Sequence, residues 1–188
     1  LEDLVPDYDP EGAKALLADA GYADGLDLDF YTSDSKGSVD MATVAQAEWQ
    51  QIGVNIDIKT SEWGTFSEYC ANGQCDMFAM SWTWYSDPYF FLNYLFHSSH
   101  IGSQGNGQGF NVPEVDELLD KAEAEPVQEE RAKLYQQALK LIVEEYPQID
   151  YANRKNILGF SSRVHGFSMS TDNAYDICST EANVWLAE

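Results

Sequence analysis

The sequence predicts an α/β fold in which a mainly parallel sheet is flanked by helices. Hydrophobic patterns with the helical period alternate with patterns of period two over about the first 150 residues. Residues that start and stop helices stand at the ends of most helical patterns. Together these observations favour a layered α/β domain over an all-helical or all-β one.

The first predicted helix lies between Asp9 and Gly21. Asp9 suits the N-cap, Pro10 suits the first turn and Gly21 suits the position just past the end. A strand is expected next, over residues 26–31, because apolar Leu26, Leu28 and Phe30 alternate with Asp27, Asp29 and Tyr31.

A second helix and strand complete a βαβ unit. An apolar stripe that includes Met41 and Ile52 ends at Gly53, and Val54, Ile56 and Ile58 then form the next strand. Such a unit crosses over right-handed and pairs its strands in parallel. The remaining elements are expected as a short helix over 66–71, a strand over 77–81, a helix from Pro88, and helices over 113–124 and 127–145 that Pro147 terminates.

Composition excludes several classes of partner. Asp and Glu number 32 against 10 Lys and Arg, a formal net charge of −22. Such a charge excludes nucleic-acid binding through a basic face and argues against contact with an anionic membrane. The acids are spread along the chain, which is typical of a solvated acidic surface, and a salt-loving proteome is one explanation for it.

An aromatic segment after the third strand is the leading candidate for a binding site. Trp82, Trp84 and Tyr85 follow the expected strand directly and precede Asp87 and Pro88. In α/β proteins, ligands bind in the crevice outside the carboxyl ends of the strands. The alternative interpretation is that these rings fill a core, as most aromatic side chains do.

Several spaced motifs resemble one family, the peptide- and nickel-binding class (family 5) of extracellular solute-binding proteins that serve ABC importers. The matching segments occur in the expected order: Tyr8-Asp9-Pro10 with Ala20-Gly21-Tyr22, Trp49 to Ile56, Gly73 to Met77, Phe110-Asn111 to Leu119, Glu130-Arg131 to Tyr146-Pro147, and Val164-His165-Gly166.

The resemblance implies an architecture and a function. Residues 1–166 would be the second lobe of a type II periplasmic-binding-protein-like fold, and residues 167–188 a C-terminal tail that packs on the first lobe. The whole protein would close its two lobes around a peptide or similar small solute, without a cofactor. It would be an extracytoplasmic monomer, anchored by lipid, that delivers the solute to a membrane permease.

The same resemblance suggests which residues of this lobe face the solute. They are Trp82, Trp84, Tyr85 and Asp87, with Thr32, Ser33 and Asp34 after the first strand and Trp63 after the second. Peptide binders of the family hold the peptide amine with an Asp two or three residues after the first tryptophan, whereas here no acid follows Trp82 until Asp87. Oligosaccharide and nickel-chelate binding therefore stay open beside peptide binding.

Three smaller constellations carry weaker hypotheses. Cys70 and Cys75 flank a short turn and could form a disulfide or contribute to a zinc site, while Cys178 would stay unpaired. His97 and His100 are weak metal candidates, since their surroundings are typical of a loop with two exposed histidines. The glycine-rich stretch over 102–109 is expected to be a mobile surface loop rather than a phosphate loop.

No catalytic motif is present in the sequence. It contains no Gly-x-Ser-x-Gly elbow, and carboxylate pairs carry little information in so acidic a chain. An acidic glycoside hydrolase is the competing class of function.

Overall fold

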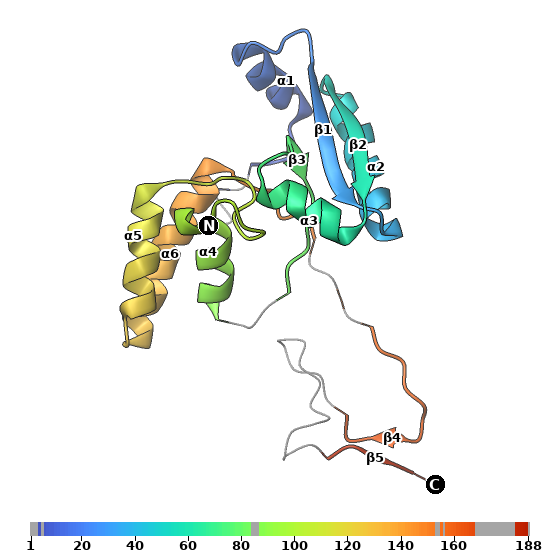
Figure 1. Cartoon of the computed structure of the whole chain (residues 1–188), viewed down its shortest axis with the longest axis vertical. Helices are drawn as coiled ribbons and strands as arrows, with labels where there is room; N and C mark the ends of the chain where they lie inside the picture. Colours follow the sequence, from blue (N-terminus) through green and yellow to red (C-terminus); the bar gives the residue numbers. More distant parts are fainter. Residues whose placement is uncertain are drawn as a thin grey trace. The chain divides into compact units, whose positions relative to one another are not determined.

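A computed structural model describes residues 4, 6–83, 87–152, 155, 157–167 and 183–187. The chain divides into two compact units, the first formed by residues 1–82 and 88–148 and the second by residues 83–87 and 149–188. Figure 1 shows the chain coloured along its sequence.

The first unit alternates helices and strands before it becomes all-helical. Its strands are β1 (Leu26–Ser33), β2 (Val54–Ser61) and β3 (Met77–Phe78). Its helices are α1 (Pro10–Asp19), α2 (Lys36–Gln50), α3 (Trp63–Ala71), α4 (Pro88–Phe96), the 3-10 turn η2 (Ser98–His100), α5 (Pro113–Ala124) and α6 (Gln128–Glu145). Side chains cap the first three helices, among them the predicted cap at Asp9, whose carboxylate accepts a hydrogen bond from the Gly12 amide at 2.9 Å.

The three strands form one parallel sheet in the order β2-β1-β3 (Figure 1). The register pairs Leu26 with Val54 and continues to Ser33 with Ser61, which confirms the predicted parallel βαβ unit. The third strand was expected over residues 77–81, but only Met77 and Phe78 pair with β1. Beyond it the chain leaves the sheet, because Trp82 packs against Tyr94 of α4 instead of continuing along β1.

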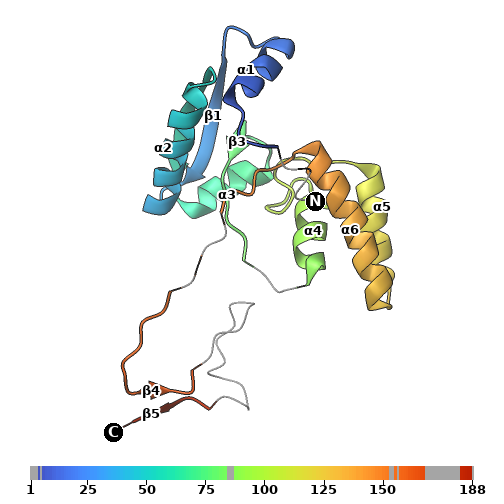
Figure 2. The same ribbon diagram turned by 180° about the vertical axis from the view of Figure 1, so that it is seen from behind.

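Helices α2 and α3 cover opposite faces of the sheet, and α2 lies in front of the sheet in Figure 2. The alternation along β1 shows the two faces, since the Phe30 ring contacts Trp49 of α2 and the Tyr31 ring contacts Tyr69 of α3. The apolar core beneath α2 is built from Phe30, Ala42, Val54 and Ile56.

The second core of this unit lies among the helices. Helices α4, α5 and α6 enclose Leu95, Phe96, Phe110, Val115, Leu119, Ala122, Tyr135, Ala138 and Ile142. Helix α6 ends at Glu145, and the next residue, Tyr146, adopts a left-handed conformation with φ 49° before Pro147, as predicted.

In the described part of the second unit, β4 (Val164–His165) pairs antiparallel with β5 (Trp185–Leu186). The rings of His165 and Trp185 stack with their centroids 4.4 Å apart. The predicted boundary between lobe and tail at residue 166 concerns contacts with a first lobe, so it stays a prediction.

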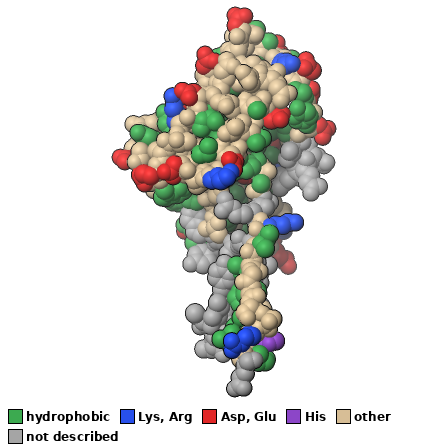
Figure 3. All heavy atoms as spheres, turned by 90° about the vertical axis from the view of Figure 1, so that its right-hand side faces the viewer, with side chains coloured by type: hydrophobic (Ala, Val, Ile, Leu, Met, Phe, Trp, Pro, Cys, Tyr) green, Lys and Arg blue, Asp and Glu red, His purple; other side chains and the backbone are tan. Residues whose placement is uncertain are grey.

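Acidic side chains are dispersed over the face of the molecule drawn in Figure 3. The face drawn in Figure 3 shows Asp and Glu scattered among uncharged side chains, with few Lys or Arg. Within the described ranges, none of the helices combines the length and apolar character that crossing a membrane requires.

Candidate functional site

The carboxyl ends of β1 and β2 bring four of the predicted site residues to one edge of the sheet. Ser33 pairs in register with Ser61, and the Asp34 amide donates to the Ser61 carbonyl at 2.9 Å. Trp63 follows two residues later as the first residue of α3. Parallel pairing therefore places Thr32, Ser33, Asp34 and Trp63 together, as the crevice rule for α/β sheets predicts.

A small network of hydroxyl groups holds the turn from β1 into α2. The Ser33 hydroxyl donates to the Ser38 hydroxyl at 2.9 Å and the Ser35 hydroxyl donates to the same group at 2.8 Å. Ser35 also caps α2. The Asp34 side chain, in contrast, is exposed. The network therefore fixes the backbone and leaves the Asp34 carboxylate to solvent.

Thr32 differs from its neighbours because its side chain is fully buried. It lies two residues after Phe30 and so faces the same side of the sheet, toward α2. Among the described residues, no group forms a hydrogen bond with its Oγ1 atom. Thr32 is thus packed between the sheet and α2 in this structure, and its direct contact with a solute stays a prediction.

Trp63 offers the aromatic surface at this edge. Its side chain is 52% exposed, and its ring meets that of buried Phe66 edge-on with centroids 5.8 Å apart. The Glu62 carboxylate accepts hydrogen bonds from the Gly64 and Thr65 amides, which holds the first turn of α3. Hydrogen bonding to the Thr65 side chain, and then to the Thr65 and Gly64 amides, lowers the pKa of Glu62. An exposed ring on a capped helix is suited to stacking against a flat or apolar group.

The aromatic segment that follows β3 is only partly described. Trp82 is half-buried, packs against the helical core and meets Tyr94 edge-on with centroids 5.8 Å apart. Trp84 and Tyr85 lie outside the described residues. Asp87 belongs to the second unit and is half-buried. The roles of these four residues in binding stay predictions, and Trp82 also has a packing role.

Sequence reasoning missed a polar groove on the α3 face of the sheet. Its lining combines Tyr31, Lys59, Thr60, Ser61, Tyr69 and Gln74 with Ile58. Lys59 pairs with Asp57 at 2.5 Å and Asp29 at 3.4 Å, and the hydrogen bond to Asp57 is the main reason that the pKa of Lys59 is raised. The alternation of Asp27, Asp29 and Tyr31 was the available signal, because it marks one polar face of β1.

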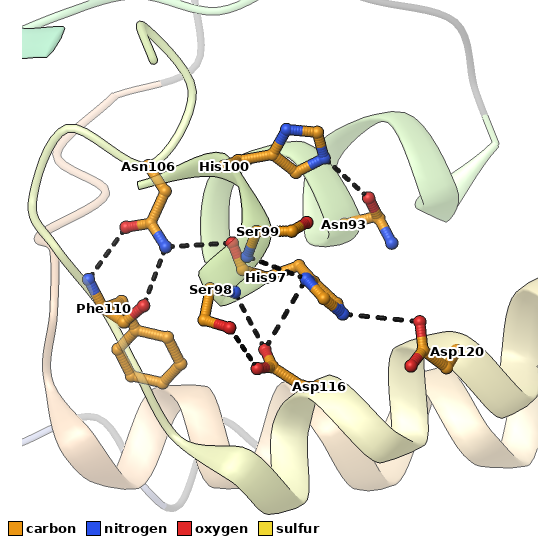
Figure 4. Close-up of polar contacts among 9 residues, drawn as sticks. All are labelled: Asn93, His97, Ser98, Ser99, His100, Asn106, Phe110, Asp116 and Asp120. Carbon is orange, nitrogen blue, oxygen red and sulfur yellow. Dashed lines mark hydrogen bonds and ion pairs between the residues drawn. The ribbon is translucent and has the colours of Figure 1, made fainter. Parts of the chain in front are cut away.

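The two histidines are engaged in the helical core rather than exposed, which corrects the expectation of an exposed loop (Figure 4). The Nδ1 atom of His97 accepts a hydrogen bond from the Ser99 amide at 3.1 Å, and its Nε2 atom lies 3.3 Å from a carboxylate oxygen of Asp120. His100 Nε2 bonds with the Asn93 side chain at 3.0 Å. Over the part of the chain that is described, no cluster of three His, Cys, Asp or Glu residues is placed to hold a metal ion.

The glycine-rich stretch is anchored by a buried residue, so the expected mobile surface loop is wrong for its centre. Asn106 is 1% exposed, and its amide group donates to the carbonyls of His97 and Phe110 at 3.1 and 2.7 Å. Its Oδ1 atom accepts from the Phe110 amide at 2.8 Å. At Gly105 a Cβ atom would lie 2.3 Å from the Tyr94 carbonyl oxygen, so close packing requires glycine there.

Cys70 and Cys75 are both free thiols in this structure. Their sulfur atoms lie 3.8 Å apart, with Cys70 buried and Cys75 half-buried. Cys178 lies outside the described residues.

Comparisons with known proteins identify relatives of this chain. The profile of the family described as "Bacterial extracellular solute-binding proteins, family 5 Middle" matches residues 2–103. The chain is 36% identical to "Heme-binding protein A" of Haemophilus influenzae over 87% of its own length and 31% of that protein. It is 30% identical to "Di/tripeptide-binding protein 2" of Pseudomonas aeruginosa over 93% of its own length and 34% of that protein.

A solved structure of a dipeptide-binding protein is also similar to this chain. The dipeptide-binding protein from Pseudoalteromonas sp. SM9913 in complex with Met-Leu superposes with a TM-score of 0.76 at 25% identity, covering 98% of this chain and 37% of the other. The chain spans about a third of the length of the curated relatives that it matches.

Proposed function

Because this chain belongs to the bacterial extracellular solute-binding proteins of family 5, we propose that it is one lobe of the substrate-binding component of an ABC importer. The component captures a peptide or similar small solute outside the membrane. Residues 1–166 form the second lobe, and residues 167–188 form a tail that packs on the first.

The arrangement at the carboxyl edge of β1 and β2 supports this proposal most directly. A polar turn at Ser33 and Asp34 lies beside the exposed ring of Trp63, and both are held by capped helices. Carboxylate, hydroxyl and aromatic groups on one rigid edge suit a zwitterionic or amphipathic solute. Closure of a second lobe over this edge would exclude water and complete the site.

The remaining partners follow from the organisation of such importers. The solute passes to a membrane permease, and the protein acts outside the cytoplasmic membrane as a lipid-anchored monomer. It requires no cofactor and performs no chemical reaction on its solute. The relatives named above are solute-binding proteins, which supports this assignment over a glycoside hydrolase.

Heme is a second candidate solute, because the relative that shares 36% identity is named for heme binding. The Nε2 atom of His100 already bonds with the Asn93 side chain, and the Nε2 atom of His97 is buried beside the Asp120 carboxylate, although no described group forms a hydrogen bond with it. Both histidines are therefore poor candidates for axial ligands to heme iron. Oligosaccharides and nickel chelates are the third and fourth candidate solutes.

A solute screen on the full-length protein tests the proposal. Thermal shift against di- and tripeptides, oligosaccharides, nickel chelates and heme should show stabilisation by one class, and calorimetry should then show saturable binding of unmodified solute. Heme binding would also change the heme absorption spectrum. Turnover of any solute, or the absence of binding across all four classes, would contradict the proposal.

A matched pair of variants locates the site. Trp63→Ala should weaken binding with little loss of stability, because the ring is 52% exposed. Trp49→Ala should lower stability and leave affinity nearly unchanged, because that ring packs against Phe30 in the core. The reverse pattern would move the site away from this edge.

A further inference from the structure

The turn between α3 and β3 holds two thiols close together. Cys70 lies in the last turn of α3 and Cys75 lies two residues before β3. Their sulfur atoms are 3.8 Å apart, so forming a bond of about 2 Å requires an approach of less than ~2 Å. Rotation of the two side chains about their Cα–Cβ bonds can move the sulfur atoms by a distance of that order.

Backbone contacts keep the two cysteines together without help from the sulfurs. The Gly73 amide donates to the Cys70 carbonyl at 3.2 Å, and the Gln74 amide donates to the Tyr69 carbonyl at 3.0 Å. Gly73 has φ 63°, the left-handed conformation that lets the chain reverse within so few residues.

Both ends of the turn are also tied to the sheet. On the Cys75 side, the Asp76 carboxylate accepts a hydrogen bond from the Asp29 amide at 3.0 Å, and Met77 pairs with Phe30. On the Cys70 side, the Tyr69 ring contacts Tyr31 of β1. The separation of the thiols is therefore set by the fold rather than by a freely moving loop.

We propose that Cys70 and Cys75 form an intrachain disulfide that joins the end of α3 to the start of β3. This bond goes beyond the proposed function. An extracytoplasmic location is oxidising enough for such bonds to form and persist.

The reaction requires a disulfide-bearing oxidant, such as oxidised glutathione or a disulfide-donating oxidase. The Cys75 thiolate attacks the oxidant, forms a mixed disulfide and releases one thiolate. Cys70 then loses its proton and attacks the Cys75 sulfur, which releases the second thiolate. Two protein thiols are oxidised and one external disulfide is reduced, so atoms and electrons balance.

The difference in exposure between the two thiols predicts that Cys75 reacts first and Cys70 second. Cys75 is half-buried and can meet the oxidant, whereas Cys70 is fully buried with its sulfur 3.8 Å from that of Cys75. Burial raises the pKa of both thiols, so the bond should form faster as pH rises toward the alkaline range.

Mass spectrometry after blocking of free thiols tests the proposal. The full-length protein is incubated with oxidised glutathione, blocked with iodoacetamide and digested with chymotrypsin. The peptide with both cysteines should then be unblocked and lighter by two hydrogen atoms than the reduced peptide. Blocking at both cysteines in the folded protein, or a bond from either one to Cys178, would overturn it.

Thermal unfolding gives a second readout. Reduction should lower the Tm by about 4–8 °C, the size expected when a short closed loop is opened in a chain of this length. Cys75→Ser should unfold at the Tm of the reduced protein and should not respond to reductant, whereas Cys178→Ser should respond as the unmodified protein does. An equal response of Cys75→Ser to reductant would also overturn the proposal.

Discussion

Replacing Asn106 by Ala should destabilise the helical core strongly, although the residue lies in a stretch of glycines and polar side chains. The side chain bonds with three backbone groups, namely the amide and carbonyl of Phe110 and the carbonyl of His97. Each buried group left without a partner costs about 1–3 kcal/mol. We therefore expect a loss of at least about 3 kcal/mol in the free energy of unfolding.

Urea unfolding followed by circular dichroism measures this loss, and the Tm should fall by about 6–12 °C. Gln108→Ala is the matched control, because Gln108 lies in the same stretch, is half-buried and donates a hydrogen bond to the Leu95 carbonyl at 2.7 Å. That variant should lose about 1 kcal/mol. If Asn106→Ala loses no more than Gln108→Ala, the stretch is a surface loop as its composition suggests and the buried network is refuted.

Three further predictions concern charge, binding and pH. The net charge of −22 should make the Tm rise between low and high NaCl, because salt screens repulsion among the acids, and a Tm that falls would contradict this. Trp63→Ala in the full-length protein should weaken solute binding by about 1–3 kcal/mol in calorimetry, and unchanged affinity would remove Trp63 from the site. The reduced protein should lose up to ~1.4 kcal/mol in the free energy of unfolding for each pH unit above about 8.5. Burial raises the pKa of Cys70 in the folded protein, so above that pH the unfolded chain releases the thiol proton more readily than the folded chain does. The disulfide form should lack this loss in thermal scans over the same pH range, and equal slopes for the two forms would contradict the assignment.

Local pattern was sufficient where neighbouring residues decide the structure. The alternation from Leu26 to Tyr31 predicted a strand with one polar face, and the cap at Asp9 predicted the start of α1. Parallel pairing of β1 and β2 followed from a strand, a helix and a strand in sequence.

Contacts between distant segments decided the features that were missed. The third strand is short because Trp82 packs on Tyr94, a contact that no local period encodes. Asn beside Gly is typical of an exposed turn. Asn106 is buried instead, and its side-chain amide donates hydrogen bonds to the backbone carbonyls of Phe110 and His97. Nothing in the spacing of His97 and His100 indicates the carboxylate of Asp120 or the amide of Asn93 beside them.

The candidate site was likewise predictable only in part. The tendency of ligands to bind at the carboxyl ends of parallel strands predicted that Thr32, Ser33, Asp34 and Trp63 lie together, because those ends meet at one edge of the sheet. It could not show that Thr32 is buried, since that depends on which face of β1 packs against α2.

The central claim, that this lobe supplies one wall of a site completed by another lobe, is tested most directly by calorimetry on two proteins. The solute found by screening is titrated into the full-length protein and into residues 1–188 alone, after circular dichroism confirms that the shorter chain is folded. We predict saturable binding by the full-length protein and an affinity weaker by at least about tenfold, ~1.4 kcal/mol, for the lobe alone. Equal affinities for the two proteins would contradict the two-lobe account.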